Sequence, residues 1–309
     1  MDPIFHIPDD TRLVDSADVL PLAGERNWGI ATFAVERLRK VTDGNGLIVG
    51  VVDTGIDDQH PLMKPNFLAS KSFINGETAK DGNGHGTHCS GTIAATDPNI
   101  GIGQGLKIVH AKGLSNGGSG GGLGIAAGIR WCVAQGAKVI SMSLGSSGED
   151  PNITAAMQEV AAQGVWVICA AGNSGGNTPD IDWPGRSKWG ISVAALNKDL
   201  SPATFSSAGA KIDTSFSGVD IWSLRPNGGF AQMSGTSMAT PGAAGVLGLM
   251  RAGMELRGIK VPMVEELRDI LFNRSTDTHT PGDDRRTGPG WLSPLLLALQ
   301  LDPDPPAVG

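Results

Sequence analysis

The sequence predicts an α/β fold in which a doubly wound, mostly parallel sheet is flanked by helices and forms a single domain. Short apolar runs alternate along the chain with segments of helical spacing, a pattern typical of such sheets. Polar residues follow several of these runs directly, and sites gather at the carboxyl ends of parallel strands. The 309 residues are enough to bury one large core. One domain is favoured over two because the polar segments are spread over residues 53–237 and have to converge.

Five apolar runs predict buried parallel strands at 47–52, 107–111, 138–144, 165–170 and 191–195. Residues 123–135 and 153–163 have the spacing of helices that cross between these strands. A long apolar helix is predicted from Ser237 to about Leu256, with Pro241 in its first turn, where a missing amide hydrogen costs little. A more amphipathic helix is predicted at 264–272, and the hydrophilic residues 277–290 predict a loop.

Charge and composition exclude several classes of function. The formal net charge is −7 and nothing basic clusters, which argues against a nucleic-acid partner. No run reaches the roughly 18 apolar residues of a membrane span, and residues 1–6 lack the features of a secretory signal. We therefore expect a soluble, cytoplasmic protein without a membrane partner. Cys89, Cys132 and Cys169 lie in apolar contexts and predict reduced thiols, which agrees with that compartment.

Three short motifs carry the groups that nucleophilic catalysis requires. Residues 51–55 (VVDTG) end an apolar run with Asp53, residues 82–88 (GNGHGTH) place His85 among glycines, and residues 234–241 (SGTSMATP) place Ser237 where a helix begins. A serine hydroxyl is a poor nucleophile at neutral pH, so it needs a nearby base and a third group that orients the base. Taken singly, the three residues could also be a core-edge aspartate, a capping histidine and a helix N-cap.

The order Asp, His, Ser in these contexts resembles that of the subtilisin-like serine peptidases, or subtilases, from about Trp28 to about Leu299. The resemblance implies a serine endopeptidase that cleaves peptides or proteins through an acyl-enzyme intermediate and needs no cofactor for the chemistry. A pseudoenzyme or peptide-binding module is one alternative, against which the intact set of groups argues. An esterase or acyltransferase that uses the same three groups is another.

The stretch AAGNSG at 170–175 contains two further candidates. Asn173 matches the family's side-chain donor to the oxyanion, with the Ser237 amide as the second donor, although Asn173 could also be an ordinary turn residue. Ser174 fits the GxSxG pattern of a different class of nucleophile. That pattern needs Asp and then His downstream, and the downstream His279 lies in a hydrophilic loop, so Ser237 is favoured.

Substrate binding in the family pairs an extended peptide with two strand segments. The matching residues here are Gly118, Ser119, Gly120, Ser143, Leu144 and Gly145. A phosphate cradle is the alternative for the glycine-rich loop 116–122, but that loop lacks the ending of a P-loop.

Asp182 precedes an aromatic-Pro pair, at a position that the family places at the bottom of the pocket for the residue before the scissile bond. The family usually has a small neutral residue there. A carboxylate predicts a preference for a basic residue before the scissile bond, because it would form a charge-assisted hydrogen bond. The alternative is that Asp182 points to water, or pairs with Arg186 or Lys188.

No metal site is predicted. His85, His88 and Cys89 lack the spacing of a zinc site; His88 matches a packed structural histidine of the family, and Cys89 a thiol beneath the catalytic histidine. Subtilases can hold structural calcium, but only residues 97–101 (DPNIG) are similar to the loop of that site, and residues 60–63 (HPLM) lack its acidic residue. We therefore expect no tight calcium site.

We divide the chain into an N-terminal extension (1–27), a catalytic domain (28–300) and a disordered tail (301–309). Too few residues precede the first strand for the pro-domain of secreted subtilases. The layout is similar to that of intracellular subtilisins, whose short extension covers the cleft and is clipped on activation. Proline resists cleavage, so we expect the segment at Ile7-Pro8 or at Leu20-Pro21 to lie across the cleft and inhibit the enzyme.

Overall fold

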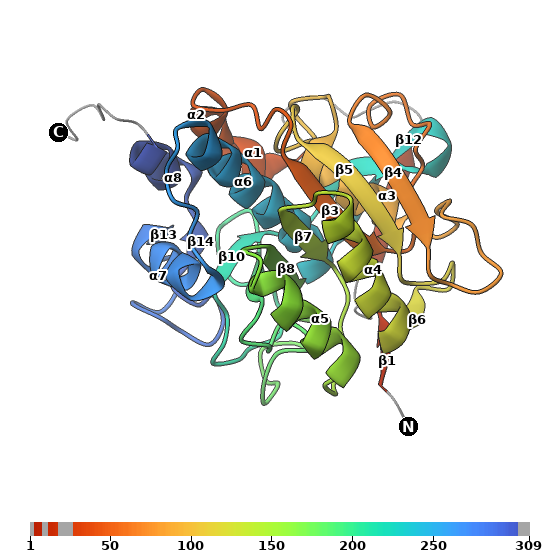
Figure 1. Ribbon diagram of the computed structural model, residues 1–309. Helices are drawn as coiled ribbons and strands as arrows, with labels where there is room; N and C mark the ends of the chain where they lie inside the picture. Colours follow the sequence, from red (N-terminus) through yellow and green to blue (C-terminus); the bar gives the residue numbers. More distant parts are fainter. Residues whose placement is uncertain (1–2, 8–11, 18–26, 302–309) are drawn as a thin grey trace.

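A nine-stranded sheet forms the centre of the molecule (Figure 1). The computed structural model describes residues 3–7, 12–17 and 27–301. The strand order is β13-β14-β10-β9-β8-β7-β3-β5-β4, and every neighbouring pair is parallel except β13 with β14. In chain order the strands are β3 (Ile48–Asp53), β4 (Phe67–Ser72), β5 (Lys107–Lys112), β7 (Val139–Met142), β8 (Trp166–Ala170), β9 (Ile191–Leu196), β10 (Thr214–Ser217), β13 (Ser275–Thr276) and β14 (Trp291–Leu292).

Helices cover both faces of this sheet, as the predicted doubly wound fold requires (Figure 1). Helices α4 and α5 pack together on one face, and α3 and α6 on the other. The bounds are α1 (Trp28–Thr32), α2 (Val35–Arg39), α3 (His85–Ala94), α4 (Gly122–Ala134), α5 (Pro151–Ala161), α6 (Thr236–Leu256), α7 (Val264–Arg274) and α8 (Pro294–Leu301).

Each central strand contributes side chains to two separate apolar clusters, because successive residues of a strand point to opposite faces. Val51 belongs to the cluster under α3 and α6, whereas its neighbour Val52 belongs to the cluster under α4 and α5. Burial on both faces explains why these strands appear in the sequence as continuous apolar runs. The five predicted strands are confirmed as β3, β5, β7, β8 and β9.

Helix α6 runs through the core, and its path depends on small residues. A Cβ on Gly242 would lie 2.5 Å from the Phe216 ring, and one on Gly245 would lie 2.6 Å from Ile102. The prediction that Pro241 lies in the first turn is wrong: the helix already begins at Thr236, so Pro241 falls in the second turn. There its missing amide hydrogen leaves the carbonyl of Ser237 without the usual helical partner.

Two smaller sheets lie outside the central one. Strand β1 (Ile4–His6) pairs antiparallel with β6 (Ser119–Gly121). Strand β2 (Arg12–Ala17) pairs antiparallel with β12 (Gly229–Ser234), which forms a hairpin with β11 (Ile221–Arg225). A short 3₁₀ turn, Pro226–Gly228, closes this hairpin. Both additional pairings therefore use residues from the start of the chain.

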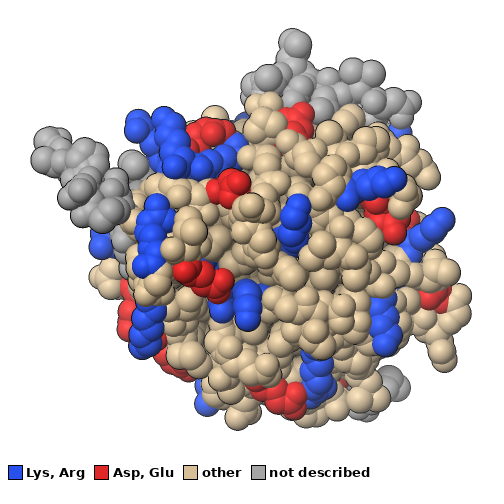
Figure 2. Space-filling model, turned by 45° about the horizontal axis from the view of Figure 1, so that its top comes forward, with Lys and Arg blue, Asp and Glu red and all other residues tan. Residues whose placement is uncertain are grey.

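The surface shown in Figure 2 carries Lys, Arg, Asp and Glu side chains of both signs interspersed. Among the described helices, none combines the length and apolar character required to cross a bilayer. Residues 277–290 form a loop, as predicted. The predicted tail lies outside the described residues except for Leu301, which ends α8 and is buried.

Candidate active site

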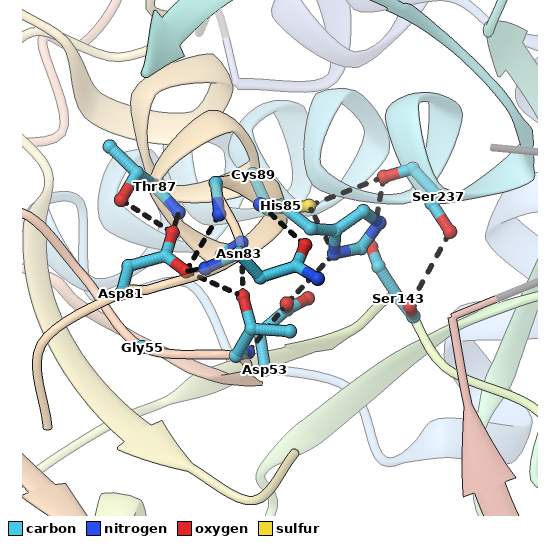
Figure 3. A network of polar contacts seen from close by, with 12 residues as sticks. Asp53, Gly55, Asp81, Asn83, His85, Thr87, Cys89, Ser143 and Ser237 are labelled. Atoms are coloured by element: carbon cyan, nitrogen blue, oxygen red, sulfur yellow. Dashed lines mark hydrogen bonds and ion pairs between the residues drawn. The ribbon is translucent and has the colours of Figure 1, made fainter. Parts of the chain in front are cut away.

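The fold brings Asp53, His85 and Ser237 together at one edge of the sheet (Figure 3). Asp53 ends β3, His85 is the first residue of α3, and Ser237 is the second residue of α6. His85 Nδ1 lies 2.7 Å from Asp53 Oδ1, and both side chains are buried. The other ring nitrogen, Nε2, has no hydrogen-bond partner within the described part of the chain. The imidazole can therefore accept a proton on the side away from Asp53.

The Ser237 hydroxyl is not hydrogen-bonded to His85 in this structure. It donates instead to the carbonyl of Ser143, at 3.4 Å. Catalytic hydrogen bonds commonly tighten only in the complex with substrate, so this separation does not exclude a nucleophile and base pair. Rotation about the Cα–Cβ bond of Ser237 moves its Oγ without moving the helix.

The carbonyl of Ser237 that Pro241 leaves unpaired within the helix is satisfied by other side chains. Ser143 Oγ donates to it at 2.9 Å, and the Cys89 thiol lies 3.5 Å away. The same thiol lies 3.8 Å from His85 Nδ1. Ser143 and Cys89 thus tie the start of α6 to β7 and α3, a role that the sequence did not predict for Ser143.

Asp81 fixes the start of α3, and the sequence analysis missed it. Its carboxylate accepts the amides of Asn83, Gly84 and Thr87, the Thr87 hydroxyl, and the Thr54 hydroxyl. Thr54 Oγ1 in turn accepts the amide of Gly86 at 2.9 Å. The end of β3 and the start of α3 are therefore joined beside the Asp53 and His85 pair. The N-cap of α3 is Gly84, so no capping signal marks Asp81, and its bond to Thr54 spans 27 positions.

Burial and charge oppose each other in the Asp53 and His85 pair. Burial alone would raise the pKa of Asp53, but the charge and hydrogen bond of His85 outweigh it, and the pKa is lowered. Burial alone would lower the pKa of His85, but the Asp53 carboxylate holds it well above the ordinary histidine value. The pair therefore favours an ionised aspartate beside a histidine with increased basicity.

Asn173 lies three residues beyond Ala170, the last residue of β8, and its amide group has a fixed orientation. Its Oδ1 accepts the Thr236 amide at 2.9 Å and the Thr236 hydroxyl at 2.8 Å. Because Oδ1 is held by these two donors, Nδ2 is the group that can donate to a substrate. The Ser237 amide, at the start of α6, has the dipole favourable for an anion. Thr236 is a second positioning residue that the sequence did not reveal.

The two predicted peptide-binding segments lie on either side of β1. Phe5 is paired with Gly120 and His6 with Ser119, and the Ile7 amide donates to the carbonyl of Gly118 at 3.0 Å. On the other side, His6 and Gly145 exchange two backbone hydrogen bonds of 3.1 and 3.0 Å. Residues 4–7 of the chain thus lie as an added strand between the segments 118–121 and 143–145.

Sequence similarity relates the chain to a known family. The Subtilase family model (Peptidase_S8) matches residues 44–290. The chain belongs to the subtilase family. It is therefore a serine endopeptidase, and its substrates are peptides or proteins.

Several named proteases are similar to this chain. Thermitase of Thermoactinomyces vulgaris is 34% identical over 235 residues, which cover 74% of this chain and 84% of that protein. An intracellular serine protease of Paenibacillus polymyxa is 38% identical over 221 residues, which cover 68% of each chain. M-protease of Shouchella clausii is 36% identical over 249 residues, or 79% of this chain. This subtilase spans 64% of the length of M-protease.

The alternative nucleophile Ser174 has no such surroundings. Its side chain is exposed, and its amide donates to Ser207 Oγ at 3.0 Å. His279, the histidine that the alternative requires, lies 3.4 Å from Asp284 in the loop 277–290. Within the described part of the chain, no hydrogen bond joins Ser174 to His279 or Asp284. His88 likewise has a structural contact, since its Nε2 lies 3.0 Å from the Ile221 carbonyl, and burial lowers its pKa to about 3.

Asp182 lies against two backbone segments. One contains Gly172, next to Asn173, and the other contains Gly145, two residues after Ser143. A Cβ on Gly145 would lie 3.0 Å from Asp182 Oδ2, and one on Gly172 would lie 2.4 Å from it. The cations that were its alternative partners make other contacts. Arg186 Nε lies 3.3 Å from Asp180, and the Lys188 ammonium lies 4.6 Å from the centre of the Trp189 ring.

The residues of the 97–102 loop do not fit a calcium ion in this subtilase. The Arg39 guanidinium donates to the carbonyls of Ile102 at 2.8 Å, Pro98 at 2.9 Å and Gly101. Calcium needs six to eight oxygen ligands, whereas the carbonyls that converge here already bind a positive charge. Arg39 was not identified from the sequence, because 58 residues or more separate it from the loop that it contacts.

Proposed function

We propose that Asp53, His85 and Ser237 form the catalytic triad of this endopeptidase. The buried 2.7 Å contact between Asp53 and His85, next to a serine at the start of a buried helix, is the observation that carries the proposal. Ser237 Oγ attacks the peptide carbonyl while His85 Nε2 takes the hydroxyl proton. The same nitrogen then protonates the leaving amine, which gives the acyl-enzyme. Asp53 remains ionised and holds the ring in the required tautomer.

In the second half of the reaction, His85 takes a proton from water, and the resulting hydroxide attacks the acyl carbonyl. Asn173 Nδ2 and the Ser237 amide would donate to the oxyanion in both tetrahedral intermediates. Ser237→Ala is expected to lower kcat on the order of 10⁶-fold, the known effect of this substitution in the family. Ser174→Ala is expected to retain most of the activity. The reverse result would identify Ser174 as the nucleophile.

The N-terminal extension is proposed to inhibit the enzyme by occupying its peptide-binding cleft. Residues 4–7 make the backbone contacts that an extended substrate would make with residues 118–120 and 145. Phe5 is fully buried, in the same apolar cluster as Leu114, Ile125 and Leu144. Further along, β2 pairs with β12, the strand that leads into Ser237. Pro8 and the predicted segment at Leu20-Pro21 lie outside the described residues.

Asp182 is proposed to favour a basic residue before the scissile bond. Its carboxylate borders the Gly145 and Gly172 segments, next to the proposed oxyanion donor Asn173. A partly buried carboxylate stabilises a cationic side chain by about 1.5–3 kcal/mol through a charge-assisted hydrogen bond. The preference would therefore be roughly 10- to 100-fold over an apolar side chain.

We also propose that the enzyme acts in a reducing compartment, the cytoplasm. Cys89, Cys132 and Cys169 are buried as free thiols, and burial raises the pKa of Cys132 and of Cys169 to about 12. Similarity to an enzyme named as an intracellular serine protease supports this location. Cell fractionation of the source organism tests it: recovery of the full chain outside the cell would contradict the proposal.

A further inference from the structure

A second buried histidine lies behind the proposed triad. His110 is on β5 and is paired with Val51 of β3. Two residues further along the same strands, Lys112 is paired with Asp53. The ring is fully buried between β3 and α3. It is therefore close to the Asp53 and His85 pair but has no part in the reaction described above.

Both nitrogens of the His110 ring have a partner. The Gly55 amide donates to Nε2 at 3.2 Å, and Nδ1 lies 3.0 Å from Ser90 Oγ. A backbone amide can only donate, so Nε2 must be unprotonated, and the ring proton lies on Nδ1, directed at Ser90. The ring must therefore be neutral to make both contacts.

The environment of His110 favours this neutral form. Burial lowers the pKa of His110 to about 4, with Asp53 and Asp81 acting to raise it and Lys112 and His85 acting to lower it. Each of these groups faces the ring from a different element: Asp53 from β3, Asp81 from the turn before α3, Lys112 from β5 and His85 from α3. At neutral pH the ring thus adds no charge beside Asp53.

The two contacts connect the elements that carry the triad. Gly55 is two residues after Asp53, and Ser90 is on the helix that begins at His85. The elements approach closely at Gly86, where a Cβ would lie 2.2 Å from the Gly55 carbonyl oxygen and 3.0 Å from His110 Cε1. The ring packs against this contact and bonds to both sides of it. The separation of Asp53 from His85 therefore depends on how the ring holds Gly55 and Ser90.

We infer that His110 is a positioning residue that sets the Asp53 and His85 contact by holding the Gly55 amide and the Ser90 hydroxyl from behind. The inference rests on the proposed triad. A displacement on the order of 1 Å within a catalytic set costs about 100-fold in rate. Substitution of His110 should therefore reduce kcat and leave KM nearly unchanged, because neither hydrogen bond of its ring involves the proposed peptide-binding segments.

The test compares full-chain His110→Ala and His110→Gln with wild type, with kcat expressed per active site titrated by a fluorophosphonate. We expect His110→Ala to lower kcat about 10- to 100-fold with KM within about twofold. The acid limb of the pH profile should move to lower pH, because a looser Asp53 contact raises the pKa of His85 less. His110→Gln should recover most of the kcat, since its amide oxygen can accept from the Gly55 amide.

Val109→Ala is the matched control, because Val109 is buried on the opposite face of the same strand. It should lower the melting temperature without a change in kcat or in the acid limb. Wild-type kcat and acid limb in His110→Ala would overturn the inference. If His110→Ala does not fold, His110→Asn replaces it in the test, because the asparagine side chain is too short to reach Gly55. Equal kcat values in His110→Asn and His110→Gln would then overturn the inference. Activity in Ser237→Ala, in the same assay, would instead overturn the proposed triad.

Discussion

At the scale of single residues, the chemistry depends on how His85 is charged. The ring can accept the serine proton only when it is neutral, and it is neutral only above its pKa. Asp53 holds that pKa well above the ordinary value, against the effect of burial. Cys89 is the other group of α3 that faces the ring, and burial raises the pKa of its thiol, so it stays protonated.

The activity should therefore rise with pH through a limb above about 6.5, the ordinary pKa of histidine. Asp53→Asn should move this limb to lower pH and reduce kcat on the order of 10⁴-fold, as for the triad aspartate of this family. A profile of kcat/KM against pH for both proteins checks this prediction. A limb that stays in place in Asp53→Asn would show that Asp53 does not set the basicity of His85.

The proposed specificity of Asp182 is tested with matched peptides that carry Arg, Phe or Leu before the scissile bond. We expect kcat/KM to favour Arg roughly 10- to 100-fold in wild type and to lose that preference in Asp182→Asn. Asp180→Asn is the matched control, since Asp180 pairs with Arg186 and should leave the preference intact. A preference for Phe or Leu that does not respond to Asp182→Asn would contradict the role.

The candidate site residues proposed from the sequence are those with local signatures. Asp53, His85, Ser237 and Asn173 each lie in a short motif, and the structure places the first three together. Asp81, Ser143 and His110 were missed as positioning residues because their roles arise from contacts between distant segments. For example, Ser143 bonds to a carbonyl 94 positions away, which becomes available only because Pro241 lies in the second turn of α6.

At the scale of elements, two partly buried cations bind backbone carbonyls of loops. Arg39, on α2, binds three carbonyls of the 97–102 loop. The Lys211 ammonium lies 3.1 Å from the carbonyl of Gly190 and 2.8 Å from Asp213. We propose that the Arg39 guanidinium provides the positive charge that a calcium ion would supply in that loop.

Thermal unfolding tests this proposal. Arg39→Met should lower the melting temperature by about 3–5 °C, because the loss of charged hydrogen bonds to three carbonyls costs about 2–3 kcal/mol and the chain is long. Arg37→Met, an exposed arginine on the same helix, should have little effect. The wild-type melting temperature should be the same in calcium and in a chelator. A large decrease in the chelator would show that calcium binds despite Arg39.

The elements that the sequence predicted correctly are those whose burial is visible in the local pattern of apolar residues. Strands buried on both faces appear as apolar runs, whereas β4, at the sheet edge, has only partly buried and exposed residues and gave no such signal. Strands β1 and β2 were also missed as strands. Their structure depends on pairing with β6 and β12, more than 100 residues away, and no local pattern encodes that pairing.

At the scale of the whole molecule, the start of the chain occupies the proposed peptide-binding cleft. Residues 4–7 complete a small sheet with the two peptide-binding segments, and in Figure 1 β1 lies beside β6 near the N-terminal end. A substrate peptide would have to displace this strand. The full chain should therefore be less active than a chain without it.

Removal of residues 1–24 should raise the rate on a small peptide substrate. In the full chain, Phe5→Ala should raise the rate at least about tenfold, because truncation of a fully buried phenylalanine costs about 3–5 kcal/mol. Ile4→Ala is the matched control, since Ile4 is 66% exposed and should not change the rate. An unchanged rate after the deletion would contradict self-inhibition.

Covalent labelling of the nucleophile tests the central claim most directly. A fluorophosphonate reacts only with an activated serine, and mass spectrometry of the labelled chain identifies the residue. The proposed triad predicts a single label on Ser237, and none on a His85→Ala variant that is folded but lacks the base. A label on Ser174, or a label on Ser237 that does not depend on His85, would contradict the proposed mechanism.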